Sequence, residues 1–324
     1  MGAYIQQMKA RATESHGVLF RDISELLYAD FPDYGNVGDS AIALGQMAYF
    51  RAAGVEVREA FSYLSIDPRR AAESRLPVII NGGGNIGGMY PLLDQHRYGL
   101  IEAIGGRSLV IQAPQSLSFC TTDASANFAR HFGPDSQTRF AARDEPSVLK
   151  AASLGVASVL ATDAVHFLGK IAPSRVAIAP YVELVRGDAE SALRDSSTSA
   201  VPRADWIRDS IVPRWRVRAT RRLVPLGFRR IARSDVQIWS SRAGQRLARG
   251  VEFLSRGEFV VTDRLHAMLI GLQMGKHVIA MDNTTRKLSS YAETWFKDLN
   301  VPLEFAGSYE EARDLARMRV RAIR

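Results

Sequence analysis

The stretch EFVVTDRLHAMLIGLQMGKHVIAMD, residues Glu258–Asp282, holds the pattern that decides the fold. It predicts a strand (EFVVTD), a helix (AMLIGLQMG) that ends at Gly275, and a second strand (KHVIAMD). Short apolar strands that alternate with helices are typical of a parallel sheet covered on both faces. The apolar run is broken only at Asp263–His266, where a strand passes into a helix, so an arginine and a histidine at this joint need an explanation.

Similar units fill the rest of the 324-residue chain. Further strands are predicted by ELLYADF, VEVREAF, LPVIIN, SLVIQAPQS, TRFAARD, ASVLATD, SRVAIAPYVE and SDVQIWSS. SAIALGQMAYFRAA predicts a helix closed by Gly54, and EPSVLKAASLG predicts one with Pro146 in its first turn and Gly155 after its end. Because a chain of this length usually forms two domains, we expect an α/β protein with domains at residues 1–170 and 171–324.

The composition excludes several classes of protein. A hydrophobic content of 46% is ordinary for a globular protein, so extended disorder is not expected. The single cysteine, Cys120, rules out an intrachain disulfide and a four-cysteine zinc site, and it suits a reducing cytosol. The start of the chain does not resemble a signal peptide, and no run approaches the ~20 apolar residues of a membrane span. We therefore expect a cytoplasmic protein.

The charge of the chain is carried mostly by arginine. The formal net charge is +8, and only six of the 42 basic residues are lysines. Arginine binds carboxylates and phosphates through paired hydrogen bonds, which favours an anionic partner, although a GC-rich coding sequence would give the same bias. Many arginines fall in an insertion near residues 191–233, interleaved with Trp206, Ile211, Trp215, Leu223 and Phe228. Two interpretations stay open for this arginine-rich segment: peripheral contact with an anionic membrane surface, and solvated or paired arginines. No nucleic-acid-binding motif is present, so nucleic acid is not an expected partner.

Four predicted loops lie at the carboxyl ends of strands, where ligands of open α/β sheets bind. In DYGNVGDS, a helix start offers free N–H groups to an anion, with Asp39 or Ser40 as the expected cap; a capped turn without a ligand is the alternative. In NGGGNIGG, residues 81–88, five glycines allow close approach by a substrate or by another chain segment.

The other two loops carry arginines. In ARDEPS, either Arg143 faces a ligand, or it pairs with a carboxylate while Asp144 caps the next helix. At the opening joint, Arg264, His266 and the free amides of a helix start converge where a phosphate or carboxylate could be held. The chain has no H-x-x-x-H, H-E-x-x-H or D-x-D spacing, so no metal site is predicted.

Taken in order, these loops resemble the polysaccharide pyruvyl transferase family. The matching pieces are NVGD, NGGGN, ARDEPS, LATDAVHFL and VVTDRLHAMLIGLQMGKHVIAMDN, with Lys287 and YAETW downstream. The resemblance implies a GT-B-like fold, in which two Rossmann-like domains face each other across a cleft, with the acceptor sugar on the first and the donor on the second. It also implies that phosphoenolpyruvate transfers its pyruvyl unit to two hydroxyls of a sugar, forming a cyclic ketal and releasing phosphate.

The resemblance implies no cofactor, and it suggests a lipid-linked oligosaccharide acceptor of exopolysaccharide biosynthesis at the inner face of the cytoplasmic membrane. Arg264 and His266 would bind the donor phosphate, with His266 also a candidate general acid because histidine titrates near neutral pH. Arg143 and Lys287 would hold donor charge, and the backbone of Leu265 would add a donor. The sugar side would be lined by Asn36, Asp39, Gly83, Gly84 and Asn85, with Asp39 as the candidate general base.

Two other functions remain open at this point. A GT-B-type glycosyltransferase that uses a nucleotide sugar would share the architecture and would also need arginines that bind phosphate. A non-catalytic binding protein or membrane-associated scaffold of an exopolysaccharide pathway would need none of the chemistry. Substitution of Arg264 or His266 separates the scaffold from an enzyme, because only an enzyme would lose turnover.

Overall fold

The computed structural model describes residues 2–62, 65–187, 201–206, 236–282 and 284–323. Its first sheet contains β1 (Glu25–Tyr28), β2 (Glu56–Ala60), β3 (Val78–Ile80), β4 (Gly83–Ile86), β5 (Val110–Leu117), β6 (Thr138–Ala142) and β7 (Ser158–Leu160). The strand order is β2-β1-β3-β5-β6-β7, and β4 pairs with β5. The accompanying helices are α2 (Val37–Ala53), α3 (Pro68–Ser74), α4 (Pro91–Ile104), α5 (Thr122–Phe132), α6 (Glu145–Ser153) and the 3₁₀ helix η1 (Ala164–Leu168).

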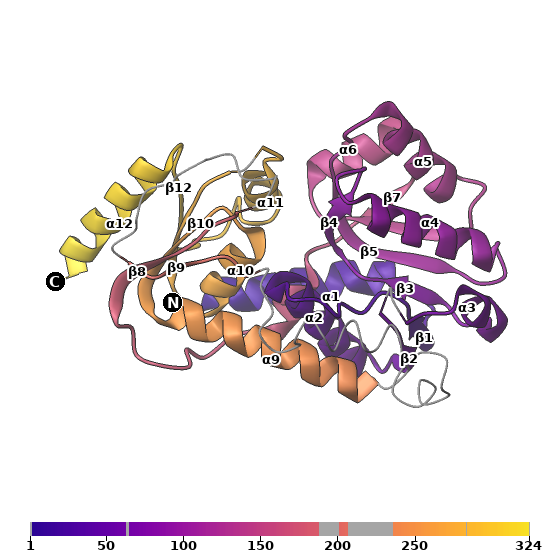
Figure 1. The fold of residues 1–324 in the computed structure, drawn as a ribbon, viewed down its shortest axis with the longest axis horizontal. Coiled ribbons are helices and arrows are strands. Elements are labelled where there is room, and N and C mark those ends of the chain that lie inside the picture. Colours follow the sequence, from indigo (N-terminus) through magenta and orange to yellow (C-terminus); the bar gives the residue numbers. More distant parts are fainter. Residues whose placement is uncertain (1, 63–64, 188–200, 207–235, 283, 324) are drawn as a thin grey trace.

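The second sheet lies beside the first (Figure 1) and is also parallel. It contains β8 (Ala179–Leu184), β9 (Arg203–Ala204), β10 (Gly257–Thr262), β11 (His277–Ala280) and β12 (Leu303–Phe305), in the order β12-β11-β10-β8-β9. Its helices are α9 (Val236–Ser255), α10 (Leu265–Gln273), α11 (Lys287–Trp295) and α12 (Tyr309–Ile323). The predicted α/β class with parallel sheets is confirmed.

In both sheets the first strand along the chain is an inner strand, and the later strands are added on either side of it. β1 lies between β2 and β3, and β8 lies between β9 and β10. Where the winding reverses, the loops at the carboxyl ends of the two neighbouring strands diverge and leave a crevice. The loops after β1 and β3 and those after β8 and β10 are therefore placed to build a site, and three of the four loops singled out in the sequence are among them.

Two helices contribute to the apolar clusters of both sheets. Helix α1 (Ala3–Leu19) runs between them, with Tyr4 and Met8 packed in the core of the second sheet and Leu19 in that of the first. Helix α2 does the same, because Val37 belongs to one cluster and Ile42 to the other. The division into domains at residues 170 and 171 stays a prediction.

The strand predicted for SDVQIWSS is wrong, because this segment starts the 20-residue helix α9. Its short alternation of apolar and polar residues imitates a strand, but Trp239, Ala243, Gly250 and Leu254 are buried at helical spacing. In Figure 1 this orange helix runs beneath both sheets. It packs on α2, so it joins the two halves of the molecule.

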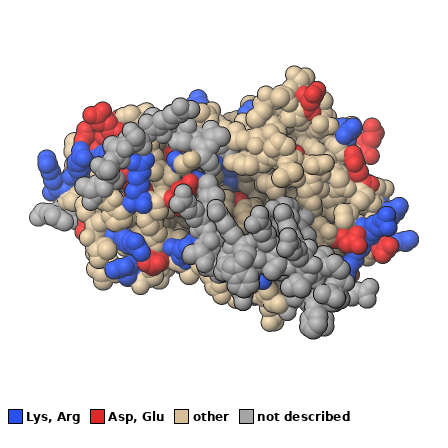
Figure 2. Space-filling view, in the orientation of Figure 1, with Lys and Arg blue, Asp and Glu red and all other residues tan. Residues whose placement is uncertain are grey.

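Most of the arginine-rich segment, and with it the predicted membrane contact, lies outside the described residues. The described part, residues 201–206, adds the edge strand β9 to the second sheet. On the face drawn in Figure 2, described Lys and Arg side chains are intermixed with Asp and Glu toward the two ends of the molecule. Among the described helices, none combines the length and the apolar character that crossing a membrane would require.

Candidate functional site

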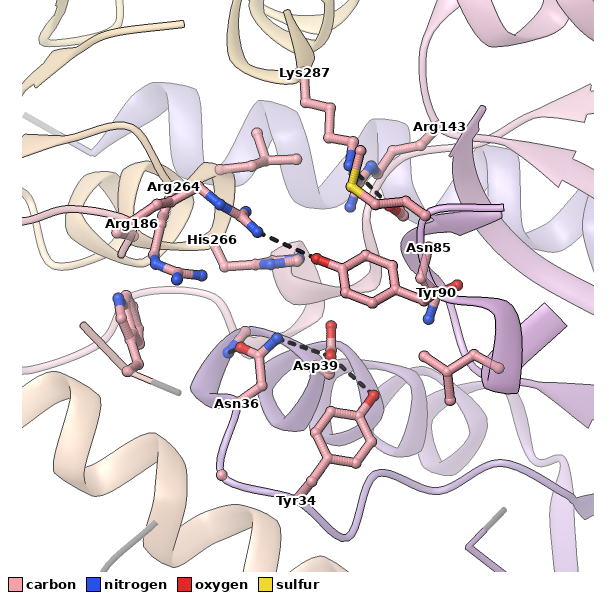
Figure 3. A pocket seen from close by; sticks show the side chains of 18 of the residues that line it. Tyr34, Asn36, Asp39, Asn85, Tyr90, Arg143, Arg186, Arg264, His266 and Lys287 are labelled. Carbon is pink, nitrogen blue, oxygen red and sulfur yellow. Dashed lines mark hydrogen bonds between the residues drawn. The ribbon is translucent and has the colours of Figure 1, made fainter. Parts of the chain in front are cut away.

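A cavity of about 510 Å³ opens between the carboxyl ends of the two sheets, a size that suits a small organic ligand (Figure 3). The first half of the chain contributes the loop after β1, the start of α2, and β4, while the second contributes the ends of β8 and β10 and the starts of α10 and α11. Of the ten predicted site residues, nine line it: Asn36, Asp39, Gly84, Asn85, Arg143, Arg264, Leu265, His266 and Lys287. Gly83 is not among the lining residues.

The joint between β10 and α10 places His266 at the cavity wall. Helix α10 begins at Leu265 with Arg264 as its N-cap, so His266 lies in the first helical turn. Its Nε2 is 3.1 Å from Oδ2 of Asp163, and its side chain is 15% exposed. A Cβ on Gly38 would lie only 2.4 Å from His266 Nδ1, so only glycine lets the start of α2 approach the ring this closely.

Two arginines of the second half reach the cavity beside this joint. Arg264 forms an ion pair with Oδ1 of Asp205 at 2.5 Å, a partner that comes from the arginine-rich segment. Arg186, just after β8, donates its backbone N–H to Asp263 at 2.8 Å and its Nη2 to the Tyr90 hydroxyl at 3.4 Å, across the cavity (Figure 3). Burial raises the pKa of Asp263 to about 6, although the Arg186 amide and nearby arginines oppose the shift.

Arg143 is buried at the end of β6, and the structure shows the interpretation of ARDEPS in which it pairs with a carboxylate. Its Nη1 donates to Asp163 Oδ2 at 2.9 Å, and its Nε and Nη2 donate to the Ser116 hydroxyl at 3.2 and 3.1 Å. Asp144 caps α6 by accepting from the Ser147 amide at 2.9 Å. Arg143 nevertheless lines the cavity as well, so pairing with a carboxylate does not remove it from the site.

Lys287 connects the second half of the chain to the glycine-rich segment of the first. It is the first residue of α11, and its Nζ donates to the Gly84 carbonyl at 2.8 Å. The loop predicted for this segment is wrong over Gly83–Ile86, which form β4, because the bare glycine backbone lies flat enough to pair with β5. The Asn85 side-chain oxygen accepts from Arg97 at 2.7 Å and from Gln115 at 3.1 Å, which fixes the amide at the cavity wall.

Asp39 lies in the first turn of α2. The helix starts three residues earlier than predicted, at Val37, so the expected caps are wrong and Asn36 is the N-cap, accepting from the Gly38 amide at 2.9 Å. This register leaves the Asp39 carboxylate facing the cavity, where Oδ2 accepts from the Tyr34 hydroxyl and from the Asn36 amide, both at 2.9 Å. Burial raises the pKa of Asp39, and His266 and the Tyr34 hydroxyl oppose this shift.

Several cavity or supporting residues were not predicted as site residues. Asp163 ends the predicted strand ASVLATD, so the rule that ligands bind at strand ends could have found it. Arg186 also follows a strand, whereas Trp206 and Asp205 belong to the arginine-rich segment and carry no such signal. The Trp206 ring is buried at the cavity, and its Nε1 has no hydrogen-bond partner in the described part of the chain. Among the described residues, no group of three His, Cys, Asp or Glu side chains is placed to hold a metal ion.

The family model and the curated relatives point to a single family. The family model described as polysaccharide pyruvyl transferase matches residues 36–285. The chain belongs to the polysaccharide pyruvyl transferase family. The predictions of this family and of a pyruvyl transferase enzyme are thereby confirmed. The matched span contains nine of the ten predicted site residues, and Lys287 lies two residues beyond it.

Two relatives and one solved structure resemble this member of the polysaccharide pyruvyl transferase family. A Bacillus subtilis (strain 168) protein named "Putative pyruvyl transferase EpsO" is 26% identical over 278 residues, covering 85% of this chain and 86% of its own. Pyruvyl transferase 1 of Schizosaccharomyces pombe is 25% identical over 303 residues, covering 85% and 71%. A crystal structure of the uncharacterised protein KP1_0663 from Klebsiella pneumoniae has a TM-score of 0.59 at 18% identity, with 93% and 99% covered, and supports the fold alone.

Proposed function

We propose that this enzyme moves the pyruvyl unit of phosphoenolpyruvate onto two hydroxyls of a sugar in an exopolysaccharide or cell-surface glycan precursor. The product is a cyclic ketal, and phosphate is released. The observation that carries this proposal is the cavity itself, in which Arg143, Lys287 and His266 converge from both halves of the chain and Asp39 lines the facing wall. In this proposal the halves act as two Rossmann-like domains in a GT-B-like arrangement.

The cationic end of the cavity suits the charge of the donor. Phosphoenolpyruvate carries a phosphate and a carboxylate, and each is best held by fixed cations and N–H groups. Arg143 is fixed by Ser116 and Asp163, and Lys287 by the Gly84 carbonyl, so neither must be reoriented when the donor enters. In the proposal, the phosphate is held by Arg264, His266 and the free amides at the start of α10.

The chemistry needs proton transfer and no redox step. His266, as an imidazolium, gives a proton to the methylene carbon of the enol, while a sugar oxygen bonds to the central carbon and its proton passes to Asp39. The bond between the central carbon and the phosphate oxygen then breaks, and the second sugar oxygen takes its place. Of the two hydroxyl protons lost, one balances the new methyl group and the other remains with the phosphate.

The sugar acceptor is proposed to lie against the wall built by the first half of the chain. Tyr34, Asn36, Asn85 and Tyr90 offer aromatic faces, amides and hydroxyls there, which are the groups that bind sugar rings and their hydroxyls. Leu92 lines the cavity and is 76% exposed, so it offers an apolar contact at the rim. This supports an acceptor that carries an apolar group, such as a lipid-linked oligosaccharide at the inner face of the cytoplasmic membrane.

A transfer assay tests the proposal directly. The purified enzyme is incubated with phosphoenolpyruvate and a panel of lipid-linked or aryl glycosides, and phosphate release is followed together with product mass. We expect acceptor-dependent phosphate release and a mass gain equal to pyruvate minus water. His266→Gln should retain the fold and lose both signals. UDP or GDP release from a nucleotide sugar, without consumption of phosphoenolpyruvate, would instead establish a glycosyltransferase.

A further inference from the structure

Asp163 is a buried carboxylate that forms hydrogen bonds with several parts of the site. It follows β7 and caps η1, and its side chain is 1% exposed. Oδ2 accepts from Arg143 Nη1 at 2.9 Å and from His266 Nε2 at 3.1 Å, while Oδ1 accepts from the Val165 amide at 3.0 Å. It does not line the cavity, so any contribution to the reaction passes through Arg143 and His266.

The contact with Asp163 leaves one nitrogen of His266 available. Nε2 is engaged behind the cavity wall, and Nδ1 lies over the bare backbone of Gly38, where a Cβ would be 2.4 Å away. Gly38, its neighbour Asp39 and His266 all line the cavity. Nδ1 is therefore the ring nitrogen that Asp163 does not engage, and it lies beside Gly38, a residue that lines the cavity.

We propose that Asp163 is a positioning residue of pyruvyl transfer: it accepts the Nε2 proton of His266 and thereby holds the ring as an imidazolium whose Nδ1–H faces the donor. The inference rests on the proposed function and adds a residue to it. A carboxylate behind a histidine fixes both the orientation of the ring and the nitrogen that is free to act.

The charges around His266 support this assignment. Two carboxylates face the ring, Asp163 from η1 and Asp39 from α2. The interaction with His266 lowers the pKa of both. Burial raises the pKa of Asp163, but His266 and Arg143 outweigh burial and hold it well below the usual range. Because burial raises the pKa of Asp39, Asp163 is the more constant anion of the two.

The remaining charged groups do not replace Asp163. Arg143, Lys287 and Arg264 approach from β6, α11 and the start of α10, and they disfavour a further positive charge. His16 and His166 also interact with Asp163, but burial lowers the pKa of each to about 4, so both are neutral near pH 7. Asp163 is therefore the carboxylate in direct contact with the His266 ring.

Asp163 also has a structural contact that a test must leave intact. Its backbone N–H donates to the Tyr291 hydroxyl at 3.1 Å, and Tyr291 lies on α11, the helix that begins at Lys287. Asp163→Asn keeps this amide and an oxygen for the Val165 cap, while it removes the negative charge and replaces the acceptor that faces Arg143 and His266 with an NH2 donor. A matched control is Glu183→Gln, because Glu183 is fully buried and pairs with Arg313 at 2.7 and 3.0 Å without lining the cavity.

Asp163→Asn should lower kcat on the order of 100-fold near pH 7.5, with a smaller change in KM for phosphoenolpyruvate. The difference in kcat between Asp163→Asn and the unsubstituted enzyme should become smaller as the pH is lowered, because the His266 ring is then protonated from solvent. Asp163→Glu should recover part of the rate. Glu183→Gln should keep the pH profile of the unsubstituted enzyme. A loss of equal size at every pH, or an unchanged kcat, would overturn the proposal.

NMR of protein with ¹⁵N-labelled histidine tests the same contact without turnover. With the His266 signals assigned through His266→Gln, the imidazolium of the unsubstituted enzyme should persist to higher pH than that of Asp163→Asn. Identical titrations would overturn the inference. If the titrations differ but no acceptor leads to consumption of phosphoenolpyruvate, the anchoring of His266 stands and the proposed reaction fails.

Discussion

At the level of single residues, the charge state of Asp39 should set the acid limit of activity. A general base works in its ionised form, and burial raises the pKa of Asp39, so activity should fall with acidity at a midpoint above the ordinary carboxyl value of about 3.9. Asp39→Asn should lower kcat roughly 100-fold or more and remove this acid limb from the pH–rate profile. Tyr34→Phe is the matched variant: it removes a hydrogen bond that lowers the pKa of Asp39, so the limb should move to higher pH. An acid limb that survives in Asp39→Asn would assign the base elsewhere.

Single residues also show where sequence reasoning ends. The arginine and histidine at the opening joint were predictable, because a strand end and a helix start meet there. The strand-end position of Asp163 was also predictable, but its pairing was not, since Arg143 and His266 are 20 and 103 positions away in the chain. Pairing over such distances depends on how the sheets come together, which local patterns do not specify.

At the level of elements, helix α9 should depend on a close contact with α2. A Cβ on Gly250 would lie 2.5 Å from Val37 and 3.1 Å from the Trp206 ring. Gly250→Ala should therefore force α9 away and lower the free energy of unfolding by about 1–3 kcal/mol. Gly244→Ala in the same helix has nothing within 4 Å and should raise the free energy of unfolding by about 0.5–1 kcal/mol, because alanine favours a helix. Urea unfolding of the two variants provides the comparison, and equal effects would contradict the packing of α9 on α2.

The same helix explains why the element prediction failed in one place. Over the eight residues of SDVQIWSS, apolar positions alternate as in a strand, and only the full 20-residue span shows the helical period. For β4 the reason is different, because glycine gives no side-chain pattern, and pairing with β5 alone makes the segment a strand. Strand β5 could be predicted because its apolar run is buried at all eight positions. The edge strands β9 and β12 were not predicted, since they are only two and three residues long.

At the level of the whole molecule, the strand order reverses beside β1 in the first sheet and beside β8 in the second, and both points face one cavity. This explains how loops far apart in sequence can form one site. The family model spans residues 36–285 and therefore elements of both sheets, in keeping with a site that needs both. The arrangement also means that a donor in the cavity would contact both halves at once.

Donor binding should therefore stabilise the entire fold. A ligand that binds only the folded state at about 100 times its Kd adds roughly 2.7 kcal/mol to the free energy of unfolding, so phosphoenolpyruvate should raise Tm by several degrees. Inorganic phosphate, which lacks the carboxylate, should give a smaller rise. Lys287→Met removes a cation and the bond from α11 to the Gly84 carbonyl, so its donor-dependent shift should be reduced. Gly244→Ala, at a position that does not line the cavity, should shift as the unsubstituted enzyme does. Scanning calorimetry measures these shifts, and a rise with UDP but none with phosphoenolpyruvate would argue for a nucleotide-sugar donor.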